Sequence, residues 1–205
     1  MRSRSFERVN AVVRALARAK SDDEMDVTGL SSTSDDDDDD EEDDELLAEW
    51  NLRKCSAAAL DVMALKFKDS RLDTLLPHLK DRIFSSDWLQ REVGILALGA
   101  IAEGCIQGVE PHLSTLVPFL INSLNHGKPL VRSIACWTLG RYSRWCINDT
   151  SEQHLTQYFV PMMEGLLRMV LDKNKRVQEA GCSAFATLEE EASHYVSNSI
   201  RLGAL

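Results

Sequence analysis

Residues 35–62 read DDDDDDEEDDELLAEWNLRKCSAAALDV, and the character of the chain changes within this stretch. Residues 35–45 are eleven consecutive carboxylates, and residues 21–45 together hold fifteen Asp or Glu and no Lys or Arg. Such a segment repels itself and has too few apolar groups to offset the entropy of ordering, so we expect residues 21–49 to form a disordered acidic loop. From Trp50 onward the pattern is that of amphipathic helices.

The net charge of −10 is placed very unevenly along the 205 residues. Residues 1–20 carry six Arg or Lys against Glu7, residues 21–45 carry −15, and residues 46–205 therefore sum to zero. The negative charge belongs to residues 21–45 and not to the helical part of the chain. The net charge therefore does not indicate that the whole protein binds basic ligands.

The first twenty residues form a short basic segment in which Phe6, Val9, Val13 and Leu16 fall on one face of a possible helix. The pattern weakly resembles a mitochondrial presequence, but a plain amphipathic helix, or a chain start that truncates a longer protein, explains it better. The odd count of five cysteines without a C-x-x-C spacing favours a reducing compartment and no disulfides. The longest apolar runs are too short for a membrane span, so no membrane insertion is expected.

Two kinds of helical segment alternate after Trp50. The first kind has one apolar stripe with i, i+3, i+4, i+7 spacing and a proline inside, and it runs from Leu72, Leu113 and Leu155. The prolines, Pro77, Pro118 and Pro161, are 41 and 43 residues apart. An interior proline costs about 3 kcal/mol in a straight helix, so three at one register predict a repeated kink.

The second kind is rich in small residues and comprises Leu52–Ala64, Leu89–Ala102, Val131–Arg144 and Val177–Glu191. Two helices per unit and a period near 40 residues predict an all-α fold, an α-α superhelix of the HEAT or armadillo kind. We place the repeats at residues 50–192, as one inner (B) helix and three outer–inner (A–B) pairs, and take residues 193–205 as the start of a truncated repeat or a frayed tail. Neither end has a polar capping repeat, which suggests a piece of a longer protein.

No constellation of catalytic or metal-ligating residues is visible. The five histidines lie far apart and make no ligand spacing with each other or with cysteine. The glycines Gly94, Gly99, Gly104 and Gly108 lack the strand and Gly-Lys-Ser/Thr of a phosphate loop, and close helix packing explains them better. We therefore expect no enzyme, no cofactor and no metal.

The acidic run admits three interpretations: a solubilising linker, a tail that binds basic proteins, or a tethered competitor that contests a basic ligand from an effective concentration on the order of mM. Trp137 admits two. It is either a core residue or an exposed aromatic anchor on the concave face, where the second kind of helix would lie.

Over about residues 35–195, the amino-acid sequence of several segments resembles that of the transportin family, the importin-β-type nuclear import receptors. The matching segments are the acidic loop followed by Trp50–Val62, Gly99–Cys105, Leu130–Ile134 with Cys136–Leu139, Arg141-Tyr142 with Trp145, Asn174–Ala180 and Cys182–Ala192. Residues 1–30 show no match, and the N-terminal arch of the family, which binds the GTPase Ran, is not present in this sequence.

The resemblance implies a concave surface that binds cargo proteins through nuclear localisation signals, either basic or hydrophobic, ending in R-x-x-Pro-Tyr-like epitopes. The family's cargo-contact positions match Ala58, Asp61, Leu96, Ile134, Trp137 and Glu190. Leu96, Ile134 and Trp137 would form an apolar pocket, while Asp61 and Glu190 would pair with Arg or Lys of the signal.

The resemblance also implies that the acidic loop couples Ran-GTP binding to cargo release. The residues of this loop are Asp35, Asp36, Asp37, Asp38, Asp39, Asp40, Glu41, Glu42, Asp43, Asp44 and Glu45. The resemblance also allows nucleoporins as partners and implies shuttling between cytoplasm and nucleus. It implies no direct binding of nucleic acid. The alternatives are a generic HEAT scaffold for folded partners and a chaperone of basic proteins that acts through the acidic tract.

Overall fold

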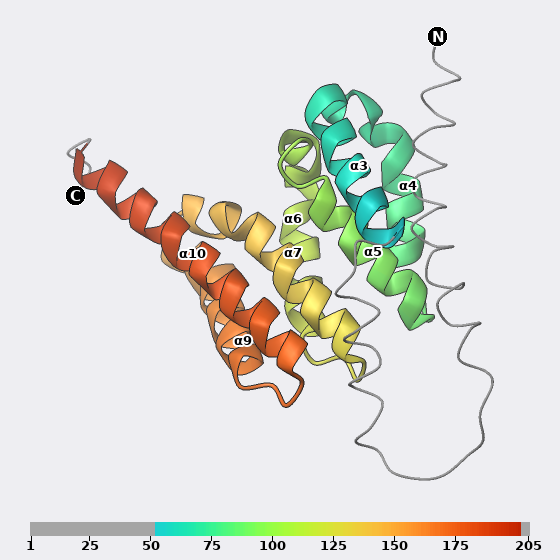
Figure 1. Ribbon diagram of the computed structural model, residues 1–205. Coiled ribbons are helices and arrows are strands. Elements are labelled where there is room, and N and C mark those ends of the chain that lie inside the picture. Colours follow the sequence, from blue (N-terminus) through green and yellow to red (C-terminus); the bar gives the residue numbers. More distant parts are fainter. Residues whose placement is uncertain (1–51, 202–205) are drawn as a thin grey trace. The chain divides into compact units, whose positions relative to one another are not determined.

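The computed structural model describes residues 52–201, which fall into two compact units on either side of the Ile106–Gln107 bond. The described residues form helices and turns and contain no strand, which confirms the predicted all-α class (Figure 1). The predicted basic segment at residues 1–20 and the acidic loop at residues 21–49 lie outside the described residues.

The first unit holds helix α3 (Leu52–Phe67), a 3-10 turn η1 (Lys68–Arg71), helix α4 (Leu72–Ile83) and helix α5 (Trp88–Ala100). Helix α5 contacts both α3 and α4, and every one of its residues from position 92 to 100 is buried. A Cβ added to Gly94 would lie 2.8 Å from the backbone nitrogen of Ile83, and one added to Gly104 would lie 2.2 Å from the carbonyl carbon of Ala64. Close backbone packing therefore requires these two glycines, as the sequence indicated.

The second unit holds helices α6 (Ile106–Ser123, its first residue in the first unit), α7 (Pro129–Asn148), the single turn α8 (Glu152–His154), the π-helical segment η2 (Leu155–Phe159), α9 (Val160–Val170) and α10 (Lys175–Arg201). Helix α10 lies along both α7 and α9 (Figure 1). The backbones of α7 and α10 come close where Gly140 faces Ala184, since an added Cβ would be 3.3 Å from the Ala184 Cα. Small residues at this point set the helix spacing.

The same hydrogen bond closes three successive turns. Near the start of α5, α7 and α10, a long side chain donates to the backbone carbonyl six residues earlier in the preceding turn. The donors are Arg91, Arg132 and Gln178, and the acceptors are the carbonyl groups of Ser85, His126 and Asp172. The repeat seen in the sequence thus extends from the apolar stripes to the polar chemistry of the turns.

The third of the aligned prolines, Pro161, does not lie in the interior of a helix as we expected. Pro77 and Pro118 lie inside α4 and α6, but Pro161 lies in the first turn of α9, directly after the π-helical segment. The Val160 N–H donates to the Leu155 carbonyl five residues back, so the wider turn accommodates the missing proline donor. The rings of Trp145, His154 and Tyr158 pack together beside this turn, with centroids 4.7–5.0 Å apart.

The last helix is longer than the pattern that predicted it. We expected helical periodicity to Glu191, and α10 continues through the boundary that we placed after residue 192 as far as Arg201. The cause is local, because residues 193–201 contain neither Gly nor Pro and the next Gly is Gly203.

Candidate functional site

One face of α7 remains accessible to solvent along the whole helix. It is the stripe formed by Leu130, Ile134, Trp137, Arg141 and Arg144, spaced by alternate steps of four and three residues. Most of the remaining residues of α7 are buried, including Val131, Cys136 and Leu139, which occupy the packed faces. A helix covered on its other sides leaves one narrow stripe for contacts with a ligand.

Trp137 lies in the middle of this stripe with 38% of its surface exposed. This decides between the two interpretations of its role: it is not a core residue. The guanidinium carbon of Arg141, one turn further along, lies 5.9 Å from the centroid of the indole ring, a cation–π geometry that favours one orientation of the ring. Ile134, one turn earlier, is half-buried and completes an apolar surface of two side chains.

The predicted cargo residues of the first unit behave differently from one another. On α3, Ala58 is exposed and Asp61 half-buried, and their i, i+3 spacing places them on one face. Leu96 is 6% exposed, because α5 is apolar on nearly all sides and is covered by its neighbours. The structure therefore presents Ala58 and Asp61 to a ligand more openly than Leu96.

In the second unit, Glu190 is exposed on α10 next to the exposed Glu189. The six predicted residues thus divide into Ala58, Asp61 and Leu96 in the first unit and Ile134, Trp137 and Glu190 in the second. The residues of the predicted regulatory loop, 35–45, lie outside the described part of the chain. A role in binding cargo stays a prediction for all of them.

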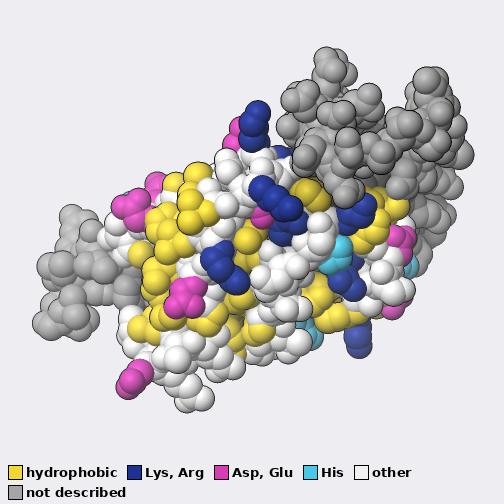
Figure 2. Space-filling model, turned by 90° about the horizontal axis from the view of Figure 1, so that it is seen from below, with side chains coloured by type: hydrophobic (Ala, Val, Ile, Leu, Met, Phe, Trp, Pro, Cys, Tyr) yellow, Lys and Arg dark blue, Asp and Glu magenta, His cyan; other side chains and the backbone are white. Residues whose placement is uncertain are grey.

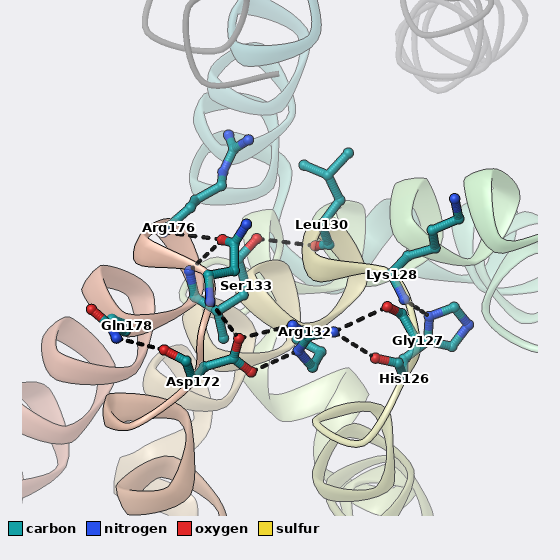
Figure 3. Close-up of polar contacts among 11 residues, drawn as sticks. His126, Gly127, Lys128, Leu130, Arg132, Ser133, Asp172, Arg176 and Gln178 are labelled. Atoms are coloured by element: carbon teal, nitrogen blue, oxygen red, sulfur yellow. Dashed lines mark hydrogen bonds and ion pairs between the residues drawn. The ribbon is translucent and has the colours of Figure 1, made fainter. Parts of the chain in front are cut away.

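A polar cluster that the sequence analysis missed joins two turns of the second unit (Figure 3). Arg132 donates from Nε to Oδ2 of Asp172 and from its NH2 nitrogen to Oδ1, both at 2.8 Å. Its remaining nitrogen donates to the carbonyl groups of His126 at 2.9 Å and Gly127 at 3.1 Å. The two partners lie 40 residues apart, so the repeat period itself was the signal that could have identified the pair.

Asp172 is held in its charged form by this cluster. Burial alone would raise the pKa of this carboxyl group. The hydrogen bonds from Arg132 and from the Asn174 backbone, with the charges of Arg132 and Lys173, outweigh burial and hold the pKa below its ordinary value. Asn174 in turn caps α10, since its side-chain oxygen accepts from the backbone N–H groups of Arg176 and Val177.

The cysteines fall into an accessible and an inaccessible set. Cys182 is exposed and Cys55 half-buried, while Cys105, Cys136 and Cys146 are buried. Burial raises the pKa of Cys105 to about 11 and those of Cys136 and Cys146 to about 12, so these three thiols stay protonated at neutral pH. We call them the buried cysteines.

Within residues 52–201 the structure brings together no group of three or more His, Cys, Asp or Glu side chains that could hold a metal ion. The apolar cavity between α3, η1 and α4 measures about 20 Å³, which is room for a water molecule and not for a cofactor. None of the described helices is long and apolar enough to cross a membrane.

Comparison with known proteins identifies the relatives of this chain. A family model described as "HEAT-like repeat" matches residues 88–142. The chain is 58% identical over 144 residues to importin subunit beta-2 of Schizosaccharomyces pombe and 56% identical over 146 residues to human transportin-1. These matches cover 70% and 71% of this chain and 16% of each relative. The chain is a homologue of a segment of the transportins.

Solved structures agree on the fold. Two structures of yeast importin-β (Kap95p) match this chain with a TM-score of 0.64 at 19% identity. One comes from a study of Kap95p binding to RanGDP, and the other is a complex with Nup1. Each match covers 89% of this chain and 18% of the other. The predicted HEAT-repeat fold and the transportin resemblance are both confirmed, and the chain spans about a sixth of the length of the transportins that it matches.

Proposed function

We propose that this chain is part of a nuclear transport receptor and binds the localisation signals of cargo proteins along the exposed stripe of α7, with further contacts to residues of α3 and α10. The observation that carries the proposal is the exposed indole of Trp137, oriented by Arg141, in a chain homologous to transportins. The proposed signals have a basic or hydrophobic stretch and end in a Pro-Tyr epitope.

The chemistry of the stripe suits such an end. A tyrosine ring placed against Trp137 gains about 0.5–1.5 kcal/mol beyond the burial of its area, and Ile134 supplies an adjoining apolar contact. Exposed tryptophans with well-oriented rings are frequent anchors of interfaces. The carboxylates of Asp61 and Glu190 supply the opposite charge for Arg or Lys residues upstream in the signal, with Arg offering the bidentate geometry.

The acidic loop, residues 35–45, would couple the binding of Ran-GTP to cargo release in the complete receptor. Support comes from its eleven carboxylates, which can contest a basic signal, and from the structural neighbour that binds RanGDP. By the same argument, the neighbour in complex with Nup1 supports nucleoporins as partners and shuttling between cytoplasm and nucleus. We propose a binding role and no catalytic one, because the transportin relatives are transport receptors.

The test is fluorescence anisotropy with a labelled peptide that carries a basic stretch and an R-x-x-Pro-Tyr end. We expect Trp137→Ala in the full chain to weaken binding at least about tenfold, which corresponds to about 1.4 kcal/mol. Leu171→Ala is the matched control, since Leu171 is an exposed apolar residue of the same unit outside the stripe. Equal affinities of the two variants would refute the assignment of the surface.

A second variant separates the receptor from a chaperone of basic proteins. Removal of the acidic run by Asp→Asn and Glu→Gln substitutions at residues 35–45 should leave peptide affinity unchanged or improve it if the run is a competitor. Loss of binding in that variant, with Trp137→Ala indistinguishable from the wild type, would make the acidic tract itself the binding element.

A further inference from the structure

The turns before α5, α7 and α10 share a second hydrogen bond besides the one that closes them. In each turn one side chain accepts from the backbone N–H two residues further on, at 2.9–3.1 Å. The acceptor atoms are Ser85 Oγ, His126 Nδ1 and Asp172 Oδ1, and the donors are the N–H groups of Asp87, Lys128 and Asn174. The carbonyl group of the same acceptor residue also takes the turn-closing bond. One residue therefore has the same place in three turns, and its side-chain chemistry differs among them.

The third turn shows that this position can hold a negative charge. Asp172 is a carboxylate there, and Arg132 binds it through Nε and NH2, each at 2.8 Å. In the first turn the acceptor is the neutral Ser85, and the NH2 nitrogen of Arg91 donates to the Ser85 carbonyl at 2.8 Å. The Nε atom of Arg91 is buried and has no hydrogen-bond partner within residues 52–201. An anionic group on the Ser85 side chain would thus lie beside a guanidinium that can bind it.

The sequence around Ser85 has the charge pattern of a kinase substrate. Arg82 stands three residues before it and Lys80 five residues before it. Kinases select substrates by such patterns, and a basic residue three positions before the serine is a common one. The turn is accessible, since Phe84 is 52% exposed, Ser86 is exposed and Ser85 is half-buried. It lies at the lower end of α4 and α5 in Figure 1, and Figure 2 shows the molecule from that side, with Lys and Arg side chains among those exposed there.

We propose that Ser85 is a phosphorylation site for a serine kinase that selects Arg82. The kinase transfers the γ-phosphoryl group of ATP to Ser85 Oγ: a P–O bond forms at the serine, the bond to the β-phosphate breaks, ADP leaves and the hydroxyl proton is released. The product carries a charge of about −1.5 to −2 at pH 7 and three acceptor oxygens. It gives the first turn the negative charge that Asp172 gives the third.

Two features attract the phosphate and one opposes it. The Arg91 guanidinium offers charge-assisted hydrogen bonds, and the N-terminus of α5 carries partial positive charge. Asp87, the N-cap of α5, is a carboxylate two residues away and repels the phosphate. The third turn has the neutral Asn174 in that place. We expect Arg91 to outweigh Asp87, because Asp87 is exposed and water screens its charge.

Incubation of the full chain with ATP and a kinase selective for arginine at this spacing, followed by mass spectrometry, tests whether Ser85 is a substrate. Ser5 has Arg2 at the same spacing and is the reference within the chain, with an Arg-x-x-Ser peptide as a second reference. We expect Ser85 to be modified at least about tenfold faster than Ser86, which has no arginine at this spacing. Absence of phosphate on Ser85 while either reference is modified would overturn the proposal.

The role of Arg82 is tested by Arg82→Gln, which keeps most of the side-chain stem and removes the charge. We expect this variant to lose at least about tenfold in the rate at Ser85 and to leave the rate at Ser5 unchanged. An unchanged rate at Ser85 would show that the kinase does not select Arg82, which contradicts the proposal.

Capture of the phosphate by Arg91 has its own readout, the second pKa of the phosphoserine measured by phosphorus NMR in the folded chain with Ser5→Ala. We expect it at least about half a pH unit below its ordinary value of about 6, because a nearby cation favours the dianion. Arg91→Gln is the matched variant, since Gln178 makes the same turn-closing bond in the third turn without a charge. It should restore the ordinary value, whereas Asp87→Asn should lower the pKa further. Equal values in the wild type and Arg91→Gln would refute the capture.

The site is independent of the proposed cargo surface. None of the six predicted cargo residues belongs to the turn or to the arginines that flank it, and the peptide assay with Trp137→Ala needs no phosphate. Either proposal can therefore fail alone.

Discussion

Truncation of Arg132 to alanine should be among the more destabilising single changes at a surface turn of this protein. The side chains of Arg132 and Asp172 are only 12% and 9% exposed, and the arginine makes four hydrogen bonds to two turns. Removal of one partner of a buried ion pair costs about 3–5 kcal/mol, and an exposed pair costs about 1 kcal/mol or less. This pair lies near the buried limit but at a turn that water can enter, so we expect a loss of about 2–4 kcal/mol.

Urea unfolding of the full chain, followed by circular dichroism, measures this loss as a shift in midpoint at constant slope. Arg168→Ala is the matched control: it also removes an arginine of these turns, but that side chain is exposed, and among the described residues it donates to Asn125 Oδ1 alone, at 3.3 Å. We expect less than about 1 kcal/mol for the control. Arg132→Lys should recover less than half of the loss, because an ammonium group cannot reproduce the bidentate geometry. Equal losses for the Ala variants of Arg132 and Arg168 would refute the reasoning.

The same pair gives a dependence on pH with a defined sign. The pKa of Asp172 is lower in the folded state, so its contribution to stability is present above the unfolded value of about 3.9. It is lost as the pH falls through the folded value. Asp172→Asn should therefore be less stable than the wild type at pH 7, and the difference should shrink below about pH 4. A difference that stays constant down to pH 2 would show that the carboxylate charge has no role.

Three other predictions concern the packing, the thiols and the stripe. Gly104→Ala should destabilise the protein by about 3 kcal/mol or more in the same urea assay, since its Cβ would meet the Ala64 backbone, whereas Gly127→Ala has open space and should be neutral or slightly stabilising. Iodoacetamide at pH 8 should modify Cys182 within minutes and leave the buried cysteines unmodified until urea is added, and mass spectrometry measures both. Rapid modification of any buried cysteine in the native protein would contradict the packing. Arg141→Ala should weaken binding of the Pro-Tyr peptide by about two- to fivefold without a loss of stability above about 1 kcal/mol, because it frees the ring of Trp137; unchanged binding would argue against an orienting role.

The helices were predictable because their physical cause is local. Apolar spacing of three and four residues, with small residues on alternate segments, indicated both kinds of helix, and the glycines at 94 and 104 were correctly attributed to close packing. Two details were not predictable from periodicity. The π-helical turn before Pro161 depends on how the backbone accommodates a missing donor, and the extension of α10 to Arg201 depends on the absence of a helix stop signal.

The candidate site was predictable only in part. Trp137 was singled out from sequence with two roles open, and the packing of α7 against its neighbours was needed to show its exposure. Arg141 was missed as a partner of the ring, although its i+4 spacing could have suggested it. The Arg132–Asp172 pair was missed because apolar stripes were aligned between repeats and polar residues of the turns were not. For Leu96 the sequence indicated too much exposure: we expected it to line a binding pocket, but its side chain is largely buried.

The charges of α10 are separated along the helix. Its first turn carries Lys175 and Arg176, while Glu189 and Glu190 lie about fourteen residues further on. At 1.5 Å per residue the two groups are about 21 Å apart, which exceeds the screening length of about 8–10 Å at physiological salt. Neither group therefore neutralises the other, so the carboxylates that we propose for a basic signal act at nearly their full charge despite the cations at the start of the same helix.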